Sequence, residues 1–197
     1  MNKNRGKILV AQTYQGPGFD DVTSFLKDLP TSRLLLRKDA DAIVENVRPF
    51  IAKHEAFLYL GPYFTRPGDF EQVNLRMNSG QGLTAHDLFT QRYDLHNVTS
   101  VVLYYGGLTR EERESDEPSL PIQRGFLTAG ANQVATFLWR LDKGSLSRVL
   151  KGIYSDFISQ GHMPPNNIFT AQSRLLKDPL TSHPYFWAGF LTLALTE

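Results

Sequence analysis

Few residues of this chain could take part in catalysis, and cysteine, the strongest side-chain nucleophile, is absent. The 197-residue chain contains no cysteine, which excludes a thiolate nucleophile, Cys-ligated zinc and disulfide bonds. The remaining reactive groups are hydroxyls, phenols, carboxylates and five histidines. Nucleophilic catalysis would therefore need a hydroxyl placed beside a base.

The histidines form no catalytic or metal-binding pattern. His86 and Asp87 are adjacent, but adjacent residues on a helix do not face each other. The other histidines lack the spacing of metal ligands; they are His54, His96, His162 and His183. We therefore predict neither a metal site nor a cofactor.

Two hydroxyls are candidates for an unusual nucleophile. Ser100 lies in an apolar run and Thr109 follows that run. Because no base is in reach of either in the sequence, we interpret both as ordinary strand and loop residues. Gly16-Pro17-Gly18 lacks the spacing of a phosphate-binding loop and predicts a plain turn.

Aromatic residues gather where two apolar runs end. They are Tyr59, Tyr63, Phe64, Tyr104 and Tyr105. Ligands bind in α/β folds at the carboxyl ends of parallel strands, so these rings either fill a cleft there or line it for a peptide. The sequence leaves both interpretations open.

The elements that position these residues alternate between strand and helix. Short apolar runs predict strands over 7–11, 33–37, 56–60, 98–105, 133–141 and 185–195. Helical spacing predicts helices over 20–29, 39–51 with Asp39 as its cap, 83–89, 123–129, 145–160 and 166–177. Residues 67–80 predict a short hairpin. Strands that are apolar on both faces indicate a parallel sheet covered by helices.

Composition excludes several functional classes. The net charge of +1 argues against a nucleic-acid partner, and no apolar run reaches the length of a membrane span. We expect one domain over residues 1–197, in the cytoplasm. The acidic run 111–117 is typical of a solvated loop, with a partner-binding segment as the alternative.

Four stretches together resemble the CHAT domain, the bacterial caspase-like peptidase fold of clan CD. They are residues 83–88, 101–107, 125–139 and 183–190. The resemblance implies a three-layer α/β/α sandwich with a mainly parallel six-stranded sheet, one antiparallel strand near the end and a small β-hairpin insertion.

The same resemblance implies that the catalytic dyad is lost. The family histidine position holds Tyr63, and the family cysteine position holds Gly106. Glycine has no side chain and an unperturbed tyrosine titrates near ~10, so neither group supplies a nucleophile or base at neutral pH. We therefore expect a pseudo-protease rather than an enzyme.

The expected function is a protein-interaction or regulatory module whose partner is a protein or peptide. The candidate groove residues are Tyr63, Phe64, Tyr105, Gly106, Gly107 and Asp142. Asp142 stands where this fold can place a specificity acid, or it caps the helix that follows. The alternatives are a hydrolase with a rearranged nucleophile such as Ser100, Thr109 or a tyrosine, and a purely structural scaffold with a filled groove.

Overall fold

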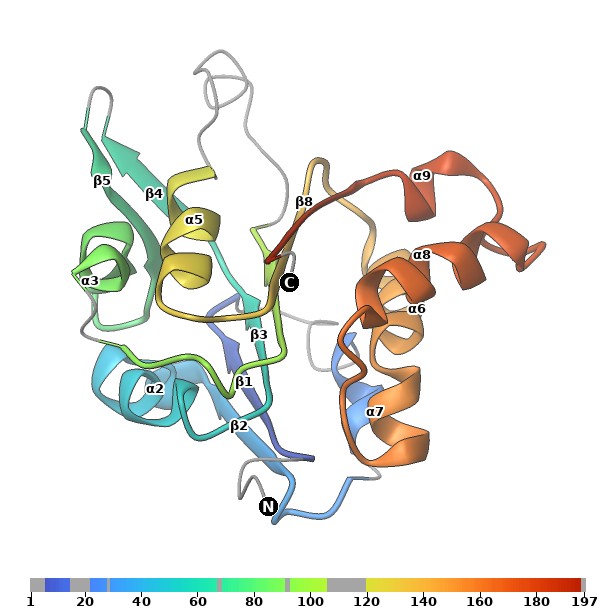
Figure 1. Ribbon diagram of the computed structural model, residues 1–197, viewed down its shortest axis with the longest axis horizontal. Helices are drawn as coiled ribbons and strands as arrows, with labels where there is room; N and C mark the ends of the chain where they lie inside the picture. Colours follow the sequence, from blue (N-terminus) through green and yellow to red (C-terminus); the bar gives the residue numbers. More distant parts are fainter. Residues whose placement is uncertain are drawn as a thin grey trace.

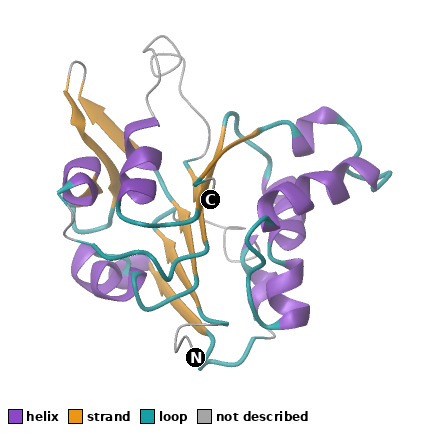
Figure 2. Ribbon diagram, viewed as in Figure 1, coloured by secondary structure: helices purple, strands orange, loops and turns teal. Residues whose placement is uncertain are grey.

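A sheet seen edge-on separates two layers of helices (Figure 1). The computed structural model describes residues 6–14, 22–27, 29–66, 69–90, 93–105 and 120–195, without the side chains of 64–66, 69–72, 120 and 190. Figure 2 shows the strands running between the two helical groups. This arrangement confirms the predicted three-layer α/β/α sandwich.

The main sheet has six strands in the order β2-β1-β3-β7-β8-β9. Their bounds are β1 Ile8–Gln12, β2 Leu34–Lys38, β3 Ala56–Leu60, β7 Ser100–Tyr104, β8 Gln133–Phe137 and β9 Phe190–Ala194. The first five run parallel, and β9 pairs antiparallel with β8. The mainly parallel sheet with an antiparallel last strand is therefore confirmed.

Alternate residues of each central strand enter different cores, because successive side chains point to opposite faces. In β1, Ile8 and Val10 pack with one cluster, whereas Leu9 and Ala11 pack with the other. The first cluster lies under α6 (Lys143–Ile153), α7 (Ser155–Gln160) and α8 (Asn167–Lys177). The second lies under α2 (Val44–Ile51), α3 (Ala85–Phe89) and α5 (Leu120–Thr128). Burial on both faces explains why these strands read as continuous apolar runs.

The predicted small β-hairpin insertion is confirmed, and it forms part of a second, three-stranded antiparallel sheet. Its strands are β4 Tyr63–Arg66, β5 Asp69–Arg76 and β6 Gly82–Thr84, in that order. The turn between β5 and β6 contains Gly80 at a φ of +80°, which glycine adopts without steric cost. Part of this small sheet lies beside the carboxyl ends of β1 and β3.

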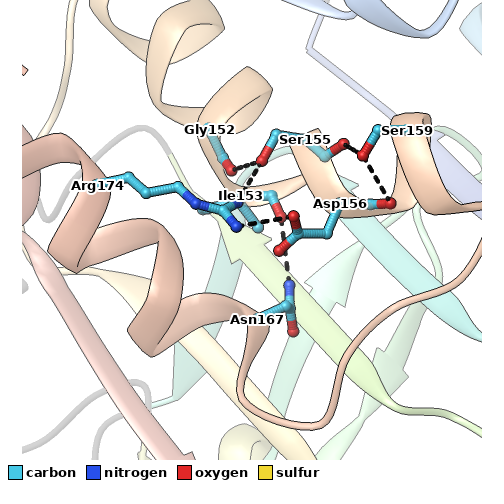
Figure 3. Close-up of polar contacts among 7 residues, drawn as sticks. All are labelled: Gly152, Ile153, Ser155, Asp156, Ser159, Asn167 and Arg174. Carbon is cyan, nitrogen blue, oxygen red and sulfur yellow. Dashed lines mark hydrogen bonds and ion pairs between the residues drawn. The ribbon is translucent and has the colours of Figure 1, made fainter.

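The long helix predicted over 145–160 is interrupted at Tyr154. Hydrogen bonds from Tyr154 N to Leu150 O and from Ile158 N to Tyr154 O still bridge the break. The hydroxyl of Ser155 donates to Gly152 O at 2.9 Å, and such side-chain bonds to the preceding turn bend helices. Figure 3 shows this contact inside a polar cluster that joins the two helices to α8.

The strand predicted over 185–195 is wrong in its first half. Residues Pro184–Trp187 form a short helix, α9, and the strand begins only at Phe190. Proline is favoured in the first turn of a helix, where its missing N–H has no partner to lose. His183 Nδ1 accepts the N–H of Tyr185 at 3.2 Å, which caps this helix.

The first two predicted helices are also corrected. Within 20–29 the structure describes a short 3₁₀ helix, η1, at Ser24–Leu26. Asp39 does not cap the next helix: it lies in a second 3₁₀ helix, η2 (Asp39–Asp41), at a φ of +52°. The α-helix begins later, at Val44. Hydrophobic spacing located both segments but not their local geometry.

Candidate functional site

The carboxyl ends of β1, β3 and β7 meet at one rim of the sheet, and the segments that leave them stay bonded to each other. Thr13 N donates to Leu60 O at 2.8 Å, and Gly61 N donates to Tyr104 O at 3.0 Å. Each strand end therefore fixes the start of its neighbour's loop. This rim is the place where α/β folds bind ligands.

Tyr59 joins three chain segments beneath the rim. Its hydroxyl donates toward the carbonyl oxygens of Pro62, at 2.6 Å, and of Arg76, at 2.7 Å. The hydroxyl of Thr13 lies 3.5 Å from the same oxygen. Burial raises the pKa of this phenol, because the charged form loses its hydration. Tyr59 is therefore a neutral hydrogen-bonding group that holds the small sheet against β1 and β3.

Tyr63 and Tyr105 come together, as the interpretation of the aromatic group required, but their rings point into the protein. The ring centroids lie 4.7 Å apart at an interplanar angle of 55°. Tyr63 is 6% exposed and Tyr105 is 4% exposed, and both belong to the core cluster under α3 and α5. The two phenols fill this part of the rim, as the plugging interpretation expects.

Tyr14 contacts the carboxyl end of β7. Its hydroxyl donates to Tyr105 O, and its ring meets the Tyr104 ring edge-on with centroids 6.3 Å apart. Tyr104 points to the opposite core and donates to Leu141 O at 3.0 Å. Burial raises the pKa of Tyr104 as well. Tyr104 and Tyr105 therefore serve different faces of the sheet.

A cavity of about 370 Å³ remains open at the rim beside these rings. It is lined by Thr13, Tyr14, Pro62, Arg76, Met77, Asn78 and Gly80. Arg76 is held by its backbone, since its N–H donates to Pro62 O and its C=O accepts from Tyr59. The lining includes one cationic residue, Arg76, one amide residue, Asn78, and the apolar residues Pro62 and Met77, and a hollow of this size suits one side chain of a peptide better than a large cofactor.

The structure does not bring Asp142 into this group. Asp142 is exposed and is the N-cap of α6, where it accepts Ser145 N at 3.0 Å and the Ser145 hydroxyl at 2.5 Å. These hydrogen bonds hold the pKa of Asp142 below its ordinary value, because they favour the charged carboxylate. The helix-cap interpretation accounts for every contact described for this side chain.

Ser100 lies at the opposite end of the sheet from the rim. It is the first residue of β7, pairs with Ala56 and is fully buried. Its backbone N–H is directed at Glu55 O. Ser100 is therefore separated from the rim by the length of β7, which reaches the rim at Tyr104.

For four residues of the sequence interpretation, the structure describes no side-chain contact. Gly106, Gly107 and Thr109 lie outside the described residues, and Phe64 belongs to β4 without a described side chain. His54, in contrast, is described: it precedes β3 and bonds Phe50 O through Nδ1 at 2.7 Å. Its position at the amino end of β3 separates it from the rim.

The sequence interpretation missed Thr13, Tyr14, Arg76 and Asn78. A signal existed for the first two, because they directly follow an apolar run that ends at the rim. Nothing local marked Arg76 and Asn78, which reach the cavity through the pairing of the small sheet. Asn78 is fixed there by its N–H to Ala42 O at 2.9 Å and by its side-chain amide to Asp39 O.

Neither a metal cluster nor a membrane helix occurs in the described part of the chain. No group of three or more His, Asp or Glu side chains is placed to hold a metal ion among those residues. Within the same ranges, no helix has the length and apolar character needed to cross a bilayer.

The parallel sheet with an antiparallel last strand, covered by helices on both faces, is a caspase-like arrangement. The family model described as CHAT domain matches residues 29–195. Because this match covers most of the chain, the protein belongs to the CHAT domain family, which has a caspase-like, peptidase-related fold. The search of curated proteins finds no match.

Proposed function

We propose that this CHAT domain is catalytically inactive and acts as a protein-interaction or regulatory module. The observation that carries the proposal is the complete absence of cysteine from the 197 residues. Thiolate catalysis needs both the sulfur and a base that activates it. The proposal therefore assigns the fold a role that depends on shape rather than on bond cleavage.

The rim geometry supports the loss of the base. Tyr63 occupies the position that the resemblance assigns to the catalytic histidine, and its ring packs against Tyr105 inside the core. A base must lie within hydrogen-bonding reach of the proton it removes. A ring that is 6% exposed and packed in this core is poorly placed for this task.

The hydrolase alternative gains little from the structure. Ser100 has no exposed surface, and its hydroxyl has no hydrogen-bond partner among the described residues. A serine nucleophile needs access to substrate and a base that accepts its proton. Ser100 is better explained as a small residue inside a central strand.

The scaffold alternative is favoured by one specific observation, the filled rim at Tyr63 and Tyr105. Against it stands the cavity of about 370 Å³ at the same rim, lined by Thr13, Tyr14 and Pro62 among others. A purely structural rim has no need of an open hollow with a cationic residue, Arg76, in its lining. The open cavity therefore favours a binding role over a filled scaffold.

A cleavage assay tests the inactivity. Purified protein is incubated with a quenched fluorescent peptide library, with an active cysteine peptidase as the positive control. We expect no turnover above buffer. Turnover that disappears in Ser100→Ala or Thr109→Ala would show that the domain is an enzyme and would overturn the proposal.

A capture experiment separates the interaction role from the scaffold role. The immobilised protein is compared with the Arg76→Ala/Asn78→Ala double variant and with Lys177→Ala, a change of an exposed residue on α8. We expect the wild type and Lys177→Ala to retain a partner protein that the Arg76→Ala/Asn78→Ala variant does not retain. If the folded wild type retains no specific protein, the result supports the purely structural scaffold role instead.

A further inference from the structure

Strand β9 forms one edge of the main sheet, and its outer side is open. Among the residues described, β9 pairs with β8 and with no other strand. In Figure 1 it is the dark red segment that leads from α9 toward the C mark. Leu195 N donates to Asn132 O at 2.9 Å, and Leu138 N donates to Gly189 O at 2.8 Å. These two bonds fix which residues of β9 face β8.

Backbone groups in an antiparallel pair alternate between the neighbouring strand and the opposite side. Because Leu195 bonds toward β8, Leu193 and Leu191 face β8 as well. Thr192 and Ala194 therefore direct their N–H and C=O groups outward. Within the described ranges, neither of these two residues forms a backbone hydrogen bond on the outer side. An unpaired strand edge of this kind is a template for another chain.

The two edges of the sheet differ in charge. The other edge strand, β2, ends in Arg37 and Lys38, and Arg37 is paired with Asp41 at 2.7 Å. Charged side chains of this kind protect a strand edge from unwanted pairing. Residues 188–196, which include β9, contain no charged side chain. The edge at β9 therefore lacks the protection that the edge at β2 has.

Leucines form a row on one face of the open edge. Leu193 lies opposite Val134, which belongs to the core cluster under α5. Side chains two residues apart share a face of a strand, so Leu191, Leu193 and Leu195 line the same face. Leu191 and Leu193 are half-buried, and Leu195 is 55% exposed. This row adds apolar surface to the unpaired backbone groups.

An antiparallel second copy of β9 satisfies the outward groups in one register. With Thr192 opposite Thr192 of the second copy, Ala194 lies opposite Phe190, and the outward residues exchange their N–H and C=O groups. In the same register Leu191 lies opposite Leu193 of the second copy, so the two leucine rows meet. The Thr192 hydroxyl oxygen is buried without a hydrogen-bond partner among the described residues, and threonine pairs across strands are stabilising.

We propose that two copies of this chain form a dimer in which their β9 strands pair antiparallel about a two-fold axis at Thr192. The two main sheets then become one continuous sheet. A charged partner strand would lose hydration here without meeting a counter-charge, which favours the uncharged second copy. A single pair of strands is a small interface, so we expect association at micromolar rather than nanomolar concentrations. This inference goes beyond the interaction role proposed above and does not depend on the inactivity.

Sedimentation equilibrium measures the association directly. From about 1 µM to about 100 µM, the mass of the wild-type protein is expected to rise from 22.3 kDa toward twice that value. A protein that stays at the monomer mass over this whole range would overturn the proposal in favour of a strand from another protein.

Proline at position 194 tests the backbone pairing. Ala194 is exposed and its N–H points outward, so Ala194→Pro removes a donor that the monomer does not use. This variant is expected to dimerise at least tenfold more weakly, or by about 1.4 kcal/mol. Ala194→Val keeps the N–H and is expected to dimerise like the wild type. Circular dichroism checks that both variants are folded, and equal association of the two would contradict strand pairing.

The absence of cysteine from the chain allows the register to be tested by cross-linking. In the proposed dimer the two Thr192 Cα atoms lie about 5.5 Å apart, a distance that a disulfide spans. The two Ala194 Cα atoms lie about 13 Å apart along the strands, which is too far. Oxidation with copper phenanthroline is expected to link Thr192→Cys into a dimer on non-reducing gels and to leave Ala194→Cys monomeric. Equal cross-linking of both variants, or none at Thr192→Cys, would overturn this register.

The two proposals fail in different ways. Dimerisation through β9 together with cleavage of the peptide library would overturn the inactivity and leave the dimer intact. An inactive protein that retains a partner through the rim, and that stays a monomer, would overturn only the dimer.

Discussion

Two buried phenols in this chain differ in what their hydroxyls reach. The hydroxyl of Tyr59 donates toward two carbonyl oxygens, whereas that of Tyr154 has no hydrogen-bond partner among the described residues. Tyr154 instead contributes its ring, which stacks on Phe25 with centroids 5.9 Å apart. Burial raises the pKa of both phenols, so both remain neutral.

This difference gives a matched pair of predictions. Tyr59→Phe is expected to reduce the free energy of unfolding by about 1 kcal/mol, because the carbonyls of Pro62 and Arg76 lose a partly buried hydrogen bond from the phenol. Tyr154→Phe is expected to be neutral or slightly stabilising, because it removes a buried polar atom that gains nothing. Urea unfolding followed by circular dichroism measures both values. A larger loss in Tyr154→Phe than in Tyr59→Phe would contradict this account.

Gly130 is a second residue whose identity is restricted by the surrounding structure. It follows α5 at a φ of +107°, and an added Cβ would lie 2.9 Å from the backbone nitrogen of His96. Gly130→Ala is therefore expected to cost about 1–3 kcal/mol of stability. Gly152→Ala is the control: its Cβ would meet Leu175 at an ordinary 3.5 Å inside α6, where alanine is favoured by up to ~1 kcal/mol. Thermal unfolding should shift in opposite directions for the two variants.

At the scale of elements, the kink between α6 and α7 is tied to α8 by one arginine. Arg174 donates to Asp156 at 2.8 Å and to the Ser155 hydroxyl at 2.7 Å (Figure 3). Asn167 adds a bond from its amide to Ile153 O at 3.4 Å. Asp156 is buried, so its carboxylate depends on this partner more than a surface acid would.

Arg174→Ala is expected to destabilise the protein by about 1–3 kcal/mol, since a buried carboxylate loses its hydrogen-bonded cation. Lys177→Ala, on the exposed end of the same helix, is expected to change stability by less than about 0.5 kcal/mol. Chemical denaturation of the two variants measures the difference. Equal losses of stability in the two variants would show that the Arg174–Asp156 contact contributes nothing beyond a charged residue near the end of α8.

At the scale of the whole molecule, His54 links folding to pH. It is buried at the amino end of the sheet, and burial lowers its pKa from the ordinary 6.5. The hydrogen bond to Phe50 opposes this shift, and Lys7 and Lys53 add to it. The unfolded chain therefore binds a proton more readily than the folded chain just below pH 6.5.

The sign of the effect follows directly. Stability contributed by neutral His54 is present above about pH 6.5 and is lost as pH falls through its lower folded pKa. The free energy of unfolding should decline in that window, and His54→Gln should flatten the decline. The carboxylate of Asp142, whose pKa is also lowered, acts only at more acidic pH. Urea titrations across the window, in wild type and variant, measure the difference.

Local sequence patterns were sufficient for the layers of the fold. Runs such as Ala56–Leu60 and Ser100–Tyr104 are apolar because both faces of a parallel strand are buried. Amphipathic spacing placed α8, and Gly161 ended α7 in the left-handed conformation that glycine tolerates. The break at Tyr154 and the helix α9 were missed, because hydrophobic periodicity continues through a kink and an aromatic run suits either structure.

The sequence by itself determined that this protein lacks a thiol, and that its chain folds as a parallel sheet between helices. Only the tertiary structure decided that the Tyr63 and Tyr105 rings turn inward, that Ser100 lies at the far end of its strand, and that Arg76 reaches the rim from the small sheet. The physical reason is the range of the interactions. The burial and periodicity of a strand or helix depend on residues that are close in the sequence. A binding surface depends on which distant segments pair and on how each side chain packs.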